Sequence, residues 1–176
     1  KKLAYLSDPG LRAIVVLDLE TQESRVLLEN SSVTTVTSGV VPTYEGRAMV
    51  HTSGKPFVSH ITSIALTKDN AYFYFKPINH YTLYRVPTVD LQNKNLTDAE
   101  LLKKVQNMGL TVITHGMEAD EKGNIYLTSS VDYSIKYLSP DGTLHTLVQD
   151  KRLLWPDSFG VGRDGYLYFS CAQIQI

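Results

Sequence analysis

The sequence predicts an all-β protein of the β-propeller class, in which small antiparallel sheets repeat around a central channel. A tyrosine-led phrase occurs four times, beginning at Tyr5, Tyr74, Tyr126 and Tyr168. The last three copies each follow a short apolar stretch and a polar turn. A strand–turn–strand unit that recurs along a chain is typical of a radial β repeat, with each unit forming one blade.

The first predicted unit, residues 1–29, is an incomplete blade. Residues 3–7 alternate in polarity, and residues 13–18 are β-branched and apolar, as expected for buried strands. Residues 24–28 follow a polar turn and form the outer strand. Because residues 3–7 match the second strands of the later units, we expect the inner strand of this blade to be missing.

Residues 30–61 are predicted to form an insertion between two blades. Glycine and proline residues divide this segment into short polar pieces. Residues 47–50 and 56–58 are the best candidates for strands, and their spacing predicts a small hairpin across residues 51–55.

Residues 62–110 are predicted to form the next blade, with a short helix near residues 98–107. Thr97 precedes the helix and Glu100 lies three residues later, which is the pattern of a capping box. Gly109 is a plausible stop for the helix. The strands of this blade are expected at 62–67, 71–76 and 82–86.

Residues 111–150 form the most regular predicted blade, and residues 151–176 begin another that is not completed. Both ends of the sequence therefore fall within a blade, so we expect about three blades of a longer propeller, whose remaining half would be a partner of this one. The strands of the regular blade are expected at 114–119, 124–129, 134–138 and 143–148.

The composition is that of an ordinary soluble domain and excludes some classes of function. Of the 176 residues, 43% are hydrophobic and 20% are charged, and the net charge is −1. The near-neutral charge argues against a nucleic-acid partner. No apolar run approaches the roughly 20 residues that a membrane-spanning helix needs. Cys171 is the single cysteine, so no disulfide can form within the chain.

Several phrases in the sequence resemble one known family. The most specific is the strand and proline of residues 82–88 followed by the short helix of residues 96–101. A second is residues 153–157 together with residues 164–169, and residues 64–69 look like an inner-strand phrase. These residues resemble the yellow/major royal jelly proteins, and in particular their bacterial yellow-like members.

The resemblance implies a six-bladed propeller, of about twice this length, that is secreted or periplasmic. It also implies a small-molecule ligand, aromatic or amine in character, without implying a particular catalytic residue. Inner strands in the family commonly open with Asp-Gly. Here the corresponding pairs are Thr62-Ser63, His115-Gly116 and Asp157-Ser158.

Candidate site residues follow from the geometry of a blade. The loop leading into the first strand and the loop joining the second to the third strand emerge on the same face of a propeller. That face is therefore the expected binding site. Glu118 is added because it is a charged residue within an inner strand. The ligand-binding candidates are His60, Asn79, His80, His115, Glu118, Asp132, Trp155, Asp157 and Gln173.

Three functions remain open at this point, and whether the protein is an enzyme is one of the open questions. The first is binding of a small aromatic or amine ligand, favoured by the grouping of His115, Trp155 and Asp157. The second is a metal-dependent lactonase or other hydrolase, similar to the gluconolactonase propellers, in which Glu118, Asp157 and Asn79 would hold a divalent cation such as Ca²⁺. The third is a non-catalytic interaction module. The histidines could be proton shuttles, metal ligands or loop residues bonded to the backbone.

Overall fold

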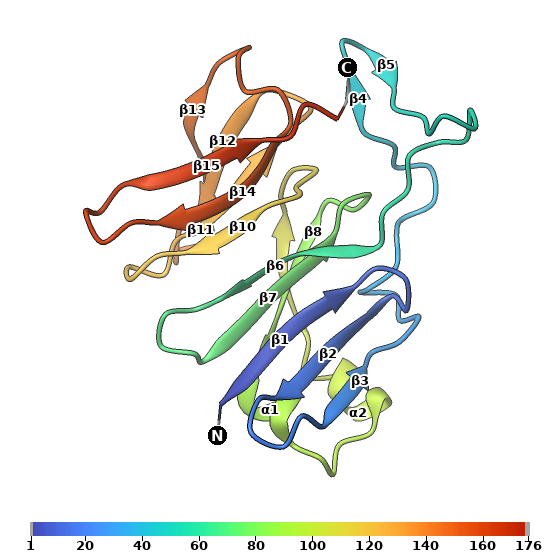
Figure 1. Cartoon of the computed structure of the whole chain (residues 1–176), viewed down its shortest axis with the longest axis vertical. Coiled ribbons are helices and arrows are strands. Elements are labelled where there is room, and N and C mark those ends of the chain that lie inside the picture. Colours follow the sequence, from blue (N-terminus) through green and yellow to red (C-terminus); the bar gives the residue numbers. More distant parts are fainter. Residues whose placement is uncertain (1, 175–176) are drawn as a thin grey trace.

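The computed structural model of the chain describes residues 2–174. It consists mainly of antiparallel sheets that fan out from the side where β1, β6, β10 and β14 lie next to one another (Figure 1). This arrangement confirms the prediction of an all-β protein with repeated sheets.

The first sheet contains three antiparallel strands in sequence order. Its middle strand is apolar and packs between sheets, where Ala13 and Ile14 are fully buried. The predicted strands agree with the observed ones to within one or two residues. The strands are β1 (Leu3–Asp8), β2 (Ala13–Asp18) and β3 (Ser24–Leu27).

The second sheet contains four strands, and the last of these was not predicted. The helix expected over residues 98–107 ends at Leu102, and residues 106–110 pair with β8 as an edge strand. Only Leu101 of the helix is buried, so little holds a longer helix in place, although the capping box of Thr97 and Glu100 is present. The elements are β6 (Ile61–Leu66), β7 (Tyr72–Pro77), β8 (Thr82–Pro87), α1 (Thr88–Gln92), α2 (Asp98–Leu102) and β9 (Gln106–Leu110).

The third sheet also has four strands, and two further strands pair beside it. Its inner strand is shorter than predicted. The backbone N–H groups of His115 and Gly116 donate to the side-chain oxygen of Thr128 instead of joining the ladder. The strands are β10 (Met117–Ala119), β11 (Ile125–Ser129), β12 (Ser134–Leu138), β13 (Leu144–Gln149), β14 (Pro156–Val161) and β15 (Leu167–Cys171).

The insertion contains a short form of the predicted hairpin and, next to it, a second hairpin that was not predicted. The strand β5 (Arg47–Ala48) pairs with β4 (Thr43–Tyr44). The predicted pairing is limited to a bridge between Val50 and Pro56, flanked by the backbone hydrogen bonds from Phe57 to Met49 and from His51 to Lys55. Glu45 and Gly46, between the two strands, both have positive φ angles, as a tight two-residue hairpin turn requires. Pro56 has no N–H to extend the alternative ladder.

Two apolar cores hold neighbouring sheets together. The first joins the first and second sheets and includes Ile14, Phe73 and Phe75, while the second joins the second and third sheets and includes Leu83 and Leu127. The repeated tyrosines contribute to this packing, since the ring of Tyr5 lies 5.6 Å from that of Phe73 in the next sheet. Face-to-face packing of separate sheets is the construction expected of propeller blades.

Candidate functional site

Polar groups from neighbouring sheets meet where the inner strands begin. Ser7 Oγ donates to the carbonyl oxygen of Thr62 at 3.2 Å, and Ser63 Oγ donates to that of Thr114 at 2.6 Å. Each bond joins one sheet to the next. Polar groups at the end of β1, at the start of β6 and just before β10 therefore link three sheets along one edge.

The titratable side chains of His115 and Asp157 contact each other on this edge. His115 Nδ1 lies 2.5 Å from Asp157 Oδ1, and the two side chains are 34% and 27% exposed. They border an open cavity of about 230 Å³ between β6, β10 and β14. The other residues around the cavity are Thr62, Ile64, Gly116, Met117, Ser158 and Phe159.

The pair depends on a close approach of two backbones. A Cβ atom on Gly116 would lie 2.1 Å from the carbonyl oxygen of Asp157. Thr128 Oγ1 accepts hydrogen bonds from the N–H groups of both His115 and Gly116, which holds this turn in place. Gly116 is the only glycine at these inner-strand openings, and its lack of a side chain allows His115 to reach Asp157.

Trp155 packs behind His115, does not line the cavity and is not an open stacking surface. It is 2% exposed and packs edge-on against Phe57 of the insertion, with ring centroids 5.8 Å apart. Its ring also lies 6.5 Å from that of His115. Its φ angle of 53° is unusual for a bulky residue, and its Nε1 has no hydrogen-bond partner within residues 2–174. This tryptophan links the insertion to the His115–Asp157 pair.

Asn79 anchors the insertion and is fully buried. Its Oδ1 accepts from the N–H of Ser59 at 2.7 Å, and its Nδ2 donates to the carbonyl oxygens of Val40 and Phe57, each at 2.8 Å. The side chain is therefore committed to the backbone, which is the opposite of what a ligand-binding or metal-binding amide needs.

Replacement of Asn79 by alanine is expected to lower the free energy of unfolding by about 2 kcal/mol, because buried backbone groups at Val40, Phe57 and Ser59 lose their partners. Chemical denaturation measures this loss, and limited proteolysis should show faster cleavage within residues 36–58. The matched control is Asn95→Ala at an exposed position, where a change below about 0.5 kcal/mol is expected. Equal effects of the two variants would contradict the anchoring role.

His60 and His80 each bond to the backbone. His60 Nδ1 accepts from the N–H of Val36, and burial together with the charge of Arg12 lowers the pKa of His60. His80 Nδ1 accepts from the N–H of Thr82, and burial together with the charge of Lys76 lowers the pKa of His80. These two histidines match the interpretation as backbone-bonded loop residues.

The remaining candidates lie apart from the pair. Glu118 accepts from Lys68 Nζ at 2.9 Å. Asp132 contacts Lys136 at 2.9 Å; burial acts to raise its pKa, but hydrogen bonds from Ser129, Ser134 and Lys136 hold that pKa below its usual value. Gln173 is exposed, with its N–H on the carbonyl oxygen of Leu154.

The metal-ligand set suggested by the sequence is not assembled. Glu118 pairs with Lys68, Asp157 pairs with His115, and Asn79 is bonded to backbone. Within residues 2–174, no group of three or more His, Cys, Asp or Glu side chains is placed to hold a metal ion.

Sequence reasoning missed Lys76, which is fully buried in β7. Its Nζ donates to Thr111 Oγ1 at 3.1 Å and to the carbonyl oxygens of Val112 and Tyr81. Burial lowers the pKa of Lys76 to about 7. The repeat itself could have pointed to Lys76. Lys76 occupies the third position of its tyrosine-led phrase, where the other copies have the small hydroxyl residues Ser7, Thr128 and Ser170.

The family model for the major royal jelly protein matches residues 1–172. The chain belongs to the major royal jelly protein family. The resemblance inferred from the strand, proline and helix of residues 82–101 is thereby confirmed. No match was found among curated proteins.

Solved structures resemble this family member in fold. A virginiamycin B lyase from Staphylococcus aureus matches 97% of this chain and 46% of its own, with 12% identity and a TM-score of 0.57. An auxiliary nutrient binding protein from Bacteroides thetaiotaomicron matches 97% of this chain and 43% of its own, with 13% identity and a TM-score of 0.59. A putative gluconolactonase matches 96% of this chain and 53% of its own, with 10% identity and a TM-score of 0.56.

The family and these neighbours together confirm the propeller prediction. The chain spans about half the length of the structures it matches. Such similarity at 10–13% identity concerns the fold alone. Within residues 2–174, no helix has the length and apolar character needed to cross a membrane.

Proposed function

We propose that this family member binds a small aromatic amine or phenol where the inner strands begin, with His115 and Asp157 as the recognition pair. The observation that carries the proposal is their 2.5 Å contact beside a cavity of about 230 Å³. Family membership supports a ligand-binding propeller.

The pair suits a ligand that donates hydrogen bonds. Since Nδ1 of His115 faces the carboxylate of Asp157, the proton of a neutral imidazole lies on Nδ1 and the lone pair on Nε2. Nε2 can then accept a hydrogen bond from an ammonium or a phenolic hydroxyl group. The negative charge of Asp157 favours a cationic ligand, and Ile64, Met117 and Phe159 supply apolar contacts for a ring.

Isothermal titration calorimetry with dopamine and tryptamine tests this proposal. Asp157→Asn is expected to weaken binding at least tenfold, because a neutral amide neither balances the ligand's charge nor orients His115 as strongly. Asp98→Asn, at an exposed position on α2, is the matched control and should leave the affinity unchanged. Absence of binding to the unmodified protein, or equal affinity in both variants, would refute the proposal.

A hydrolase is the second candidate, because a histidine held by a carboxylate is also the arrangement of a general base. The fold shared with a putative gluconolactonase motivates glucono-δ-lactone as the first substrate to try, with and without Ca²⁺. Turnover lost in a His115→Gln variant would support this candidate. Turnover that requires Ca²⁺ and is unchanged in the His115→Gln variant would place the chemistry at another site.

We also infer from family membership that the complete protein is a six-bladed ring located outside the cytoplasm. The family resemblance supports both points. Sequencing of the whole gene and fractionation of the source cells test them together.

A further inference from the structure

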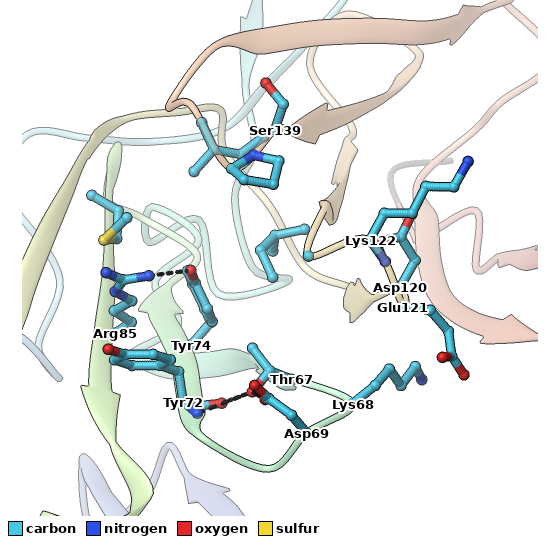
Figure 2. A pocket seen from close by; sticks show the side chains of 15 residues that line it. Thr67, Lys68, Asp69, Tyr72, Tyr74, Arg85, Asp120, Glu121, Lys122 and Ser139 are labelled. Carbon is cyan, nitrogen blue, oxygen red and sulfur yellow. Dashed lines mark hydrogen bonds between the residues drawn. The ribbon is translucent and has the colours of Figure 1, made fainter.

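A second pocket lies between the second and third sheets, at the turns and away from the starts of the inner strands. Figure 2 shows this inter-sheet pocket, with Tyr72, Tyr74 and Arg85 on one wall and the turn of residues 120–123 on the other. Its volume is about 310 Å³. Both sheets that form it have four strands.

Arg85 is held rigidly on its wall. Its Nε donates to Gln106 Oε1 at 2.8 Å. Its Nη1 donates to the hydroxyl of Tyr74 at 3.0 Å (Figure 2). The guanidinium carbon lies 4.2 Å from the centre of the Tyr72 ring. A cation that is stacked and hydrogen-bonded in this way loses little further entropy when it binds an anion.

The guanidinium has no acidic partner in the part of the chain that the structure describes. The ion pairs there are formed by other cations, at Lys68, Lys94, His115, Lys136 and Arg152. Arg85 is half-buried, and its Nη2 group has no recorded acceptor among residues 2–174. A partly desolvated guanidinium with spare donors is suited to a carboxylate, which it binds in a two-pronged manner.

Two of the three acidic residues that line the pocket are bound within their own turns, and the third, Glu121, lies beside Asp120. Asp69 accepts from Thr67 Oγ1 at 2.6 Å and from the N–H of Ala71 at 3.0 Å. Asp120 accepts from Asn124 Nδ2 at 2.8 Å and from the hydroxyl of Tyr126 at 3.1 Å. These contacts stabilise the turns, and within residues 2–174 none of the three carboxylates forms an ion pair with Arg85.

The rest of the pocket is apolar enough to hold a ring. Ile125 and Leu138 are almost fully buried, and Met108 and Pro140 add further apolar surface around them. A volume of about 310 Å³ is at the lower end of the range, roughly 300–1,000 Å³, that small-molecule sites occupy. A flat apolar body with one anionic group matches these walls in both shape and charge.

We propose that the inter-sheet pocket binds a small aromatic carboxylate, with the carboxylate paired to Arg85 and the ring against the accessible apolar side chains of Met108 and Pro140. This site is separate from the His115–Asp157 pair and would select the opposite charge. The chain would thus carry one site for ligands that donate hydrogen bonds or are cationic, and another site for anionic ligands.

Calorimetric titration with 4-hydroxycinnamate and with its methyl ester tests the proposal. The acid is expected to bind at least tenfold more tightly than the ester, since the ester cannot form the charged pair with Arg85. Arg85→Lys should weaken binding of the acid at least tenfold, because an ammonium cannot reproduce the two-pronged contact. Equal binding of acid and ester, or no binding of the acid, would overturn the proposal.

Two further variants guard against effects on folding and against binding elsewhere. Lys122→Glu adds a negative charge at the rim of the pocket from an exposed side chain and should weaken binding of the acid severalfold. Asp157→Asn changes the other site. Loss of 4-hydroxycinnamate binding in Asp157→Asn with full binding in Arg85→Lys would place the ligand at His115 and overturn the proposal.

Discussion

The free energy of unfolding of the wild-type chain is expected to rise, relative to that of a Lys76→Met variant, as the pH increases from 7 to 10.5. Lys76 has a folded-state pKa of about 7, against 10.5 for an ordinary lysine. Between these values the unfolded chain binds a proton at Lys76 that the folded chain does not. Stability therefore increases with pH, by roughly 1.4 kcal/mol per unit.

The sign follows from burial. Lys76 is fully buried, so the folded state disfavours the charged form of the amine. The stabilising contribution is complete above pH 10.5, where the amine is neutral in both states, and is lost as the pH falls through 7. Methionine has a similar length and does not titrate, and the other titrating groups are common to both proteins.

Urea denaturation of both proteins at several pH values from 7 to 10 measures the difference. A Lys76→Ala variant is the companion, and it should be less stable than Lys76→Met by about 2–4 kcal/mol at every pH, because it leaves a cavity and neither variant titrates at this position. A wild-type minus Lys76→Met difference that stays constant with pH would show that Lys76 keeps an ordinary pKa, which would contradict the prediction.

Gly116→Ala is expected to destabilise the protein by about 2–4 kcal/mol, because the new methyl group would meet the backbone of Asp157. The nearest atom, the carbonyl oxygen of Asp157, lies 2.1 Å from the position of the added carbon. Backbone atoms cannot rotate aside, so β10 and β14 must separate. The same movement should break the contact between His115 and Asp157.

Thermal and chemical denaturation measure the stability change, and the NMR signals of the His115 ring report on its contact with Asp157. Gly160→Ala is the matched control, since it lies in β14 and no atom is within 4 Å of its added carbon. The control should change stability by less than about 0.5 kcal/mol. A Gly116→Ala protein as stable as the control would show that the two strands can separate at little cost.

Much of the fold is predictable because it rests on local patterns. Alternation and β-branched residues locate the strands of the first sheet, and Thr97 with Glu100 locates the start of α2. The pattern does not reveal β9, because Gln106–Leu110 is largely exposed and lacks alternation. That edge strand exists because β8 offers it a hydrogen-bonding partner.

The candidate site was only partly predictable. The strand order of a propeller places His115 and Asp157 on one face, and the structure brings them into contact. The same rule also selected Asn79, His60 and His80, whose side chains bond to backbone. Position in the sequence does not distinguish residues that border the cavity from residues bonded to the backbone. The partners of Asn79, for example, come from an insertion whose path is not set by the repeat.

By itself, the sequence determined the all-β class, the repeat and the family. Each of these follows from short-range periodicity and from phrases such as residues 82–88, which depend only on neighbours along the chain. Tertiary structure alone decided the burial of Lys76, the close approach at Gly116 and the pocket beside Arg85. The physical reason is that each of these features arises where separate segments or sheets meet, and the distance between two sheets is a property of their packing.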